Sequence, residues 1–291
     1  WYVWATAAII LSACCWKRAA GSVGTVALFT TSSRMPISRS PRRRRGRVSF
    51  YGDLYSMKNA RWLYTDHQRR TGLVVLDSAT QTVIKTPFNP RDCYPIQRER
   101  EVYERLAERG RHQGTLSYHG EVDGGGIRLE FASKLDLQSF IQGQDVDPGL
   151  RLRWIIQLAD TLAFIHDAGI IHGDLTTANV FLDDGLNARL ADFAGSSIDL
   201  SPLLVEVTAS HLYPGNLLSA QGDIFALGSV IYEVTTGKGP YAGLSDASIR
   251  SLFQKGDFPD VTSLGRLGDI IRTCWGGGYE DSKALVKELK G

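Results

Sequence analysis

The chain has 291 residues, of which 43% are hydrophobic and 22% are charged, proportions that are ordinary for a soluble globular protein. Its net charge of +2 conceals an asymmetry: residues 1–50 carry nine Lys or Arg and no Asp or Glu, so the remainder carries +2 less 9, or −7. A mildly acidic body argues against nucleic acid as the main partner. The four cysteines form no C-x-x-C pair, which argues against a zinc site and a disulfide framework.

The first 58 residues differ in composition from the rest. Residues 1–16 are uncharged and mostly apolar but short for a membrane-spanning helix, and residues 19–49 are rich in Ser, Thr and Arg. We interpret residues 1–58 as a basic, disordered extension with an apolar start; a targeting segment or a basic phospholipid-binding patch is the alternative. No stable membrane span is expected, and the globular part is predicted to be intracellular and cytoplasmic.

The next stretch of the chain has the pattern of short strands. Residues 61–67, 73–76 and 82–85 are rich in β-branched or aromatic side chains. Gly72 and the polar residues 78–81 separate them, as turn residues do. The pattern predicts a three-stranded meander.

Helical spacing dominates the remainder. Residues 97–109 combine this spacing with many charges, which predicts an exposed helix, and residues 127–131 predict one more strand. Apolar side chains at helical spacing then predict helices over residues 150–168, 223–235 and 282–290. Strands first and helices afterwards predict an α+β chain.

Two short motifs carry the strongest functional signal. They are H-G-D-L-T-T-A-N at residues 172–179 and D-F-A at residues 192–194. Asp174 precedes Asn179 by five residues and Asp192 by 18 residues. The motifs and their spacing resemble the H-R-D-L-x-x-x-N catalytic loop and the D-F-G motif of the eukaryotic-type protein kinase superfamily. Together with D-I-F-A-L-G further along, they resemble a group of protein kinases common in filamentous fungi.

The resemblance covers about 230 residues. It implies a bilobal kinase-like fold, with a small β-rich N-lobe over residues 59–132 and a larger helical C-lobe over residues 133–291. D-I-F-A-L-G at residues 223–228 resembles the start of the family's long buried helix, whose Asp braces the backbone of the catalytic loop. Small-molecule phosphotransferases also use an H-G-D loop, but this later region favours the protein kinase fold.

The resemblance also implies chemical roles. Asp174 would accept the proton of an attacking protein Ser or Thr hydroxyl, and Asn179 and Asp192 would hold Mg²⁺ against the phosphates of ATP. The expected catalytic set is therefore Asp174, Asn179 and Lys85, and the implied cofactors are ATP and Mg²⁺. Without the resemblance, each of these residues would be an ordinary polar loop or strand residue.

Further matches imply a nucleotide site. Lys85 ends a V-I-K stretch that resembles V-A-I-K, so it would contact the α- and β-phosphates. Its expected partner on the next helix is Glu101, with Glu99 and Glu104 as alternatives. The expected nucleotide-binding residues are Gly72, Val74, Lys85, Glu101, Glu130, Ala132, Asn179 and Asp192.

Several positions depart from the family pattern. His67 and Arg69 occupy glycine positions of the phosphate loop, Ala194 replaces the glycine of D-F-G, and the catalytic loop lacks its usual basic residue. Gly173 replaces the Arg that reads a phosphorylated activation loop. The hydroxyls of residues 194–213 are interpreted as turn-forming or solvated, with regulatory phosphorylation sites as the alternative; they are Ser196, Ser197, Ser201, Thr208 and Ser210. These departures keep a nucleotide-binding pseudokinase open as the alternative to an active kinase.

Overall fold

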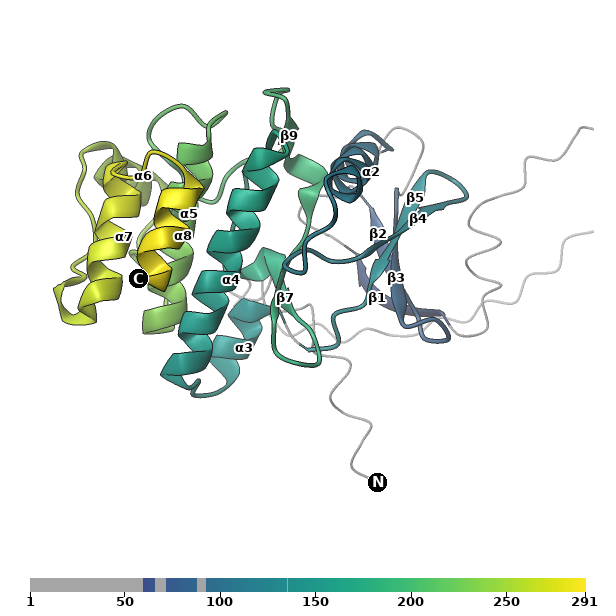
Figure 1. Cartoon of the computed structure of the whole chain (residues 1–291), viewed down its shortest axis with the longest axis horizontal. Helices are drawn as coiled ribbons and strands as arrows, with labels where there is room; N and C mark the ends of the chain where they lie inside the picture. The colour runs from purple at the N-terminus through teal and green to yellow at the C-terminus, as the bar shows by residue number, and fades with distance from the viewer. Residues whose placement is uncertain (1–59, 66–71, 88–92, 135) are drawn as a thin grey trace, which may run out of the picture.

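The computed structural model describes residues 60–65, 72–87, 93–134 and 136–291. A lobe built on a β-sheet is followed by a larger helical lobe (Figure 1), which confirms the expected α+β, bilobal fold. The predicted extension over residues 1–58, as well as His67 and Arg69, lies outside the described residues. Within the described ranges, no helix is both long enough and apolar enough to cross a membrane.

The small lobe contains an antiparallel five-stranded sheet. Its strand order is β1-β2-β3-β5-β4, so the predicted meander of β1, β2 and β3 is confirmed. The strands are β1 (Ala60–Thr65), β2 (Leu73–Asp77), β3 (Thr82–Thr86), β4 (Tyr118–Val122) and β5 (Gly126–Glu130). Lys85 pairs with Val74 on β2 and with Ile127 on β5, which places it on a central strand with Val74 on the same face.

Helix α2 (Cys93–Glu108) packs beside this sheet and begins four residues before the predicted start. Pro95 fits its first turn, where a backbone N–H has no partner within the helix. The expectation of an exposed helix is wrong for one face: Arg98 and Glu99 are only 5% and 1% exposed. Both are buried because other elements supply their polar partners.

The large lobe is mainly helical. Its helices are α3 (Leu137–Gly143), α4 (Pro148–Asp167), α5 (Ala220–Thr236), α6 (Asp246–Gln254), α7 (Arg266–Gly276) and α8 (Ser282–Lys290). Its short strands are β6 (Ile170–Ile171), β7 (Val180–Leu182), β8 (Ala188–Leu190) and β9 (Ser197–Ile198). The helices predicted over residues 150–168, 223–235 and 282–290 are confirmed as α4, α5 and α8, whereas α3, α6 and α7 were not predicted.

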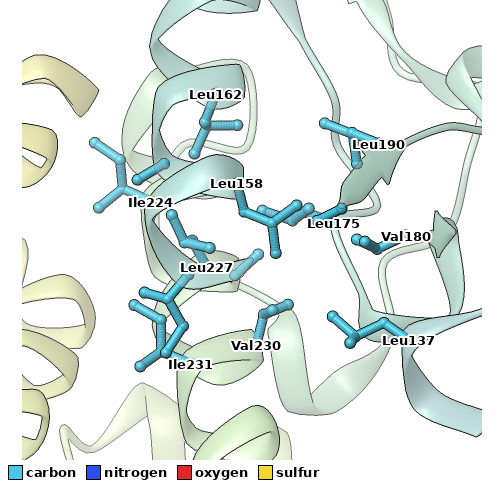
Figure 2. Close-up of a cluster of buried hydrophobic side chains, with 14 of the residues drawn as sticks. Leu137, Leu158, Leu162, Leu175, Val180, Leu190, Ile224, Leu227, Val230 and Ile231 are labelled. Atoms are coloured by element: carbon cyan, nitrogen blue, oxygen red, sulfur yellow. The ribbon is translucent and has the colours of Figure 1, made fainter. Parts of the chain in front are cut away.

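The core of the large lobe lies between α4 and α5. Figure 2 shows Leu158 and Leu162 of α4 with Ile224 and Leu227 of α5, all of which are at most 1% exposed. Leu175, within the 174–179 segment, and Val180, directly after it, belong to the same cluster. The polar motif is therefore anchored by apolar side chains that are buried in the core.

The contact of α5 with α7 requires a small residue at Gly228. An added Cβ there would lie 2.7 Å from Cys274 Cβ and 3.2 Å from Trp275 Cδ1. We expect Gly228→Ala to lower the free energy of unfolding by about 1–3 kcal/mol, because overpacking outweighs the gain in helix propensity. Urea unfolding would measure this change. Gly239→Ala is the matched control, because nothing lies within 4 Å of its added Cβ; equal midpoints for the two variants would contradict the prediction.

Candidate active site

The backbone of the 172–179 loop is braced by a buried carboxylate. Asp223, on α5, accepts hydrogen bonds from the backbone N–H groups of His172, at 2.7 Å, and Gly173, at 2.9 Å. The ring Nε2 of His166 lies 2.9 Å from the same carboxylate. Although burial acts to raise the pKa of Asp223, these partners hold it below its usual value, so the brace is an anion. The brace implied by the D-I-F-A-L-G resemblance is therefore present.

Within this loop, Asn179 is oriented by Asp174. The side-chain nitrogen of Asn179 donates to the backbone oxygen of Asp174, at 2.7 Å, and to its carboxylate Oδ2, at 3.1 Å. The backbone N–H of Asp174 donates to Nδ1 of His172, whose Nε2 lies 3.0 Å from the backbone oxygen of Ala191. His172 thus joins the loop to the residue before Asp192, provided that its proton resides on Nε2.

An ion cluster, buried at Glu99 and partly exposed at Asp192, links the two lobes. The ammonium of Lys85, on β3, lies 2.7 Å from Oε2 of Glu99 on α2 and 2.6 Å from Oδ1 of Asp192. Burial acts to lower the pKa of Lys85, but the charges of Asp192 and Glu99 outweigh it and raise that pKa. Lys85 therefore remains a cation held between one residue of each lobe.

The expected pairing of Lys85 with Glu101 is wrong. The Glu101 side chain is 43% exposed, accepts a hydrogen bond from Gln97 and lies 3.8 Å from Nε of Arg98. Glu104 pairs with Arg100, on the outside of α2. Two residues along an α-helix turn the side chain by about 200°, so Glu99 and Glu101 point to opposite sides. The pattern of charges along the helix did not reveal which side faces the cluster.

The segment after β8 (Ala188–Leu190) positions Asp192. Asp192 has a left-handed backbone, with φ 61° and ψ 63°, and its side chain is 40% exposed. Phe193 is fully buried and packs its ring against those of Tyr103 and His172. Ala194 lies within the 3-10 helix η3 (Phe193–Gly195), in a conformation that does not require glycine. The alanine is therefore accommodated without backbone strain.

Asn179 and Asp192 offer a donor set that suits Mg²⁺. Because the amide nitrogen of Asn179 faces Asp174, its amide oxygen is turned away from that carboxylate. One carboxylate and one amide oxygen fit an ion that also binds substrate phosphates and water. Across the described ranges, no three His, Cys, Asp or Glu side chains gather into a metal cage. The residues present therefore fit Mg²⁺ held jointly with a phosphate ligand.

Two of the expected nucleotide-binding residues have structural contacts of their own. The carboxylate of Glu130 accepts hydrogen bonds from the backbone N–H and hydroxyl of Ser117, at 3.0 and 2.8 Å. An added Cβ at Gly72 would lie 2.8 Å from the backbone oxygen of Thr86 and 3.3 Å from Ile96 Cδ1. The absence of a side chain at Gly72 is therefore explained by packing.

An apolar cluster that the sequence reasoning missed joins residues 129–132, which correspond to the kinase hinge between the lobes, to the motifs. Ala132 is 6% exposed and contacts Leu116 and Ala191, and Phe181 packs against the three. Phe181 follows Asn179 by two residues, and Ala191 immediately precedes Asp192. Their adjacency to the polar motifs is the signal that could have identified them.

The hydroxyls after Ala194 are more buried than expected. Ser196 and Ser197 are fully buried, so their interpretation as solvated loop hydroxyls is wrong. Ser196 donates to the backbone oxygen of His172 at 2.9 Å. The Ser201 hydroxyl accepts a hydrogen bond from the backbone N–H of Ile198 at 3.0 Å. These side chains fasten the segment to the catalytic loop and to itself.

Comparison with known proteins agrees with this arrangement. A family model described as "protein tyrosine and serine/threonine kinase" matches residues 123–282, more than half of the chain. The chain belongs to the protein kinase family. The matched range contains Asp174, Asn179 and Asp192, whereas Lys85 and Glu99 of this kinase-family chain lie before it.

Curated relatives carry kinase names and are longer than the matched region. Wall-associated receptor kinase 4 of Arabidopsis thaliana is 34% identical over 126 residues, which cover 38% of this chain and 17% of that protein. Salt tolerance receptor-like cytoplasmic kinase 1 of Oryza sativa subsp. japonica is 27% identical over 194 residues, covering 59% of this chain and 52% of that protein. Dual specificity protein kinase Ttk of Danio rerio is 27% identical over 164 residues, covering 48% and 16%. The kinase-family chain thus spans at most about half of any of these three relatives.

Proposed function

We propose that this chain transfers the γ-phosphoryl group of ATP to Ser or Thr hydroxyls of a protein, using Mg²⁺. The observation that supports this most is the convergence of Lys85, Glu99 and Asp192 in one ion cluster. Asp174 and Asn179 lie in a hydrogen-bonded loop, tied through His172 to the residue before Asp192. In phosphoryl transfer the protein contributes mainly by positioning the reactants and by stabilising charge.

In the proposed mechanism, each residue has one task. Lys85, held by Glu99, neutralises charge on the α- and β-phosphates, and Asp174 orients the acceptor hydroxyl and takes its proton. Asn179 and Asp192 would hold Mg²⁺, which would neutralise charge on the phosphates when bound. Asp223 keeps the loop backbone in place as these charges develop.

An adenine site is proposed at the apolar cluster. Ala132, Leu116, Ala191 and Phe181 offer a small apolar surface between the hinge and the motifs. A flat heterocycle suits such a surface, and the backbone polar groups of the hinge would fix its orientation. Val74, next to Lys85 on the same face of the sheet, would cover the opposite side.

A nucleotide-binding pseudokinase is the second candidate. The observations that favour it are His67 and Arg69 at glycine positions and the absence of a basic residue in the 172–179 motif. Side chains at glycine positions would hinder close approach of the backbone to the phosphates. Loss of one cation that stabilises the transition state can cost roughly 10²–10³ in rate.

Affiliation and location are also proposals. The H-G-D-L, D-F-A-G-S-S and D-I-F-A-L-G segments support a place in the group of protein kinases common in filamentous fungi. A protein substrate follows from the kinase proposal, and a cytoplasmic location is proposed because the cysteine pattern does not suggest a disulfide framework. Neither nucleic acid nor a membrane is proposed as a partner.

An ATP titration with and without Mg²⁺ tests the nucleotide site. We expect Mg²⁺ to strengthen binding in the unmodified chain, and we expect Asp192→Asn to abolish that gain because a divalent cation loses its one charged ligand. Asp199→Asn is the matched control, since the Asp199 carboxylate is 65% exposed and pairs with Arg105 instead. Equal ATP affinity with and without Mg²⁺ in the unmodified chain would contradict the assignment.

A phosphotransfer assay then separates the two candidates. The γ-phosphate of ATP would be followed onto a degenerate library of Ser/Thr peptides. Transfer that depends on Mg²⁺ supports the kinase. Mg²⁺-dependent binding without transfer favours the pseudokinase.

A further inference from the structure

Helix α2 carries a buried cation next to the residue that holds Lys85. Arg98 precedes Glu99 and is only 5% exposed. Its Nη1 donates to the backbone oxygen of Ser196 at 2.7 Å and to the hydroxyl of Ser201 at 2.8 Å. The backbone oxygen of Pro202 lies 3.4 Å from the same nitrogen. One guanidinium thus joins α2 to both ends of the 196–202 segment.

This arrangement couples the position of the helix to that of the segment. Burying a cation is costly unless hydrogen bonds replace its hydration. Besides the segment, the neighbours of Arg98 are Glu101, 3.8 Å from Nε, and Tyr94, whose hydroxyl accepts a hydrogen bond from Nη2 at 3.1 Å. Both neighbours lie on α2 itself, so among the described residues the partners of Arg98 from outside the helix all belong to the segment. Displacing the segment would leave the buried Nη1 without the acceptors it has here.

Residues 203–205, which directly follow the segment, are packed against the 172–179 loop and η3. An added Cβ at Gly173 would overlap the side chain of Leu203, and one at Gly195 would lie 2.5 Å from Cβ of Val205. The backbone N–H of Leu204 donates to the backbone oxygen of Gly195 at 2.9 Å. Leu203 therefore fills the space beside Gly173 with an apolar side chain and holds the end of the 196–202 segment in place without a phosphate.

We infer that Arg98 is a positioning residue, which fastens α2 to the 196–202 segment and thereby keeps Glu99 on Lys85 without a phosphorylated side chain. The inference rests on the proposed phosphoryl transfer. The four observations that carry it are the burial of Arg98, its two short hydrogen bonds, its place next to Glu99 and the packing of Leu203 on Gly173.

Three variants of α2 test this role in the full chain. Arg98→Met should lower kcat for the Ser/Thr peptide library by about tenfold to a hundredfold, because a misplaced Glu99 loosens Lys85. KM for ATP should change much less, since the hinge is untouched. Arg98→Lys keeps the charge and one donor, and should recover most of the lost kcat. Arg100→Met is the control, because Arg100 pairs with Glu121 at 2.8 Å and lies away from the segment; we expect a change of about twofold or less.

Amide hydrogen exchange keeps the inference testable apart from catalysis. If the unmodified chain transfers no phosphate, the proposed function fails, but Arg98→Met should still speed exchange in residues 196–202 and in α2 more than Arg100→Met does. Arg98→Lys should restore slow exchange. Should Arg98→Met not fold, Ser201→Ala replaces it, with a smaller change in the same direction.

Two results would overturn the inference. One is exchange and turnover that are the same for all the Arg98 and Arg100 variants. The other is a tenfold loss of kcat when the purified chain is treated with phosphatase, because a phosphate would then be doing what is assigned to Arg98. Turnover that survives phosphatase within about threefold, under 1 kcal/mol of barrier, supports it.

Discussion

Asp174→Asn should reduce phosphoryl transfer by about 10²–10⁴-fold while the affinity for ATP with Mg²⁺ stays within about twofold. An amide has nearly the shape of the carboxylate but cannot take the proton of the acceptor hydroxyl. Asn179 would keep its hydrogen bond to the backbone oxygen of residue 174, so the loop should hold its conformation. The expected loss corresponds to roughly 3–5 kcal/mol of barrier. Single-turnover transfer to the Ser/Thr peptide library, beside an ATP titration, measures both quantities.

A distant aspartate provides the control for this substitution. Asp145 is fully exposed and lies near Arg151, so Asp145→Asn removes the same charge away from the site. We expect that variant to transfer phosphate at the rate of the unmodified chain. If Asp174→Asn retained a tenth or more of the turnover, Asp174 would not be the base. Its role in the motif would then be to shape the loop.

Glu99→Gln should lower kcat by about a hundredfold, and Glu101→Gln by about twofold at most. Glu99 holds the Lys85 ammonium at 2.7 Å from the side of the small lobe, while Asp192 holds it from the other side. Without the Glu99 charge, Lys85 is drawn towards Asp192, where it competes for the carboxylate proposed to hold Mg²⁺. The same amide substitution at Glu101 removes only a half-exposed charge. Measuring kcat for both variants in parallel shows which of the two glutamates, Glu99 or Glu101, holds Lys85 during turnover.

Comparing Glu99→Gln with Glu101→Gln also tests whether the position of a glutamate relative to Lys85 matters, rather than its presence on α2. Both residues are glutamates on α2, two positions apart, so helix propensity and net charge change equally in the two variants. A larger loss for Glu101→Gln than for Glu99→Gln would mean that the helix turns its other face to Lys85 during turnover. Equal and small losses would mean that Asp192 alone suffices to hold the ammonium.

Much of this fold could be predicted from local sequence patterns. The meander followed from stretches rich in β-branched or aromatic side chains between turn residues, and α4, α5 and α8 followed from apolar side chains at helical spacing. The strand β4 (Tyr118–Val122) was missed because its residues alternate between half-buried and exposed, and none has the fully buried side chain that marks a strand. The lobe boundary at residues 132–133 stays a prediction; β5 ends at Glu130 and α3 begins at Leu137.

The sequence by itself determined the residues whose roles depend on spacing along one stretch of chain. Asp174 and Asn179 lie on one short loop, so local order sets their arrangement. The motif around Asp223 was likewise recognisable in the sequence, although its hydrogen bond to Gly173 is a tertiary contact. Only the tertiary structure decided which charged residues of α2 are buried and which partners they have. Charged residues there occur on every face, and which of them is buried depends on where the helix docks. Docking selects Arg98 and Glu99, because the oxygens of the 196–202 segment and the Lys85 ammonium come from distant parts of the chain and replace the water that those charges lose.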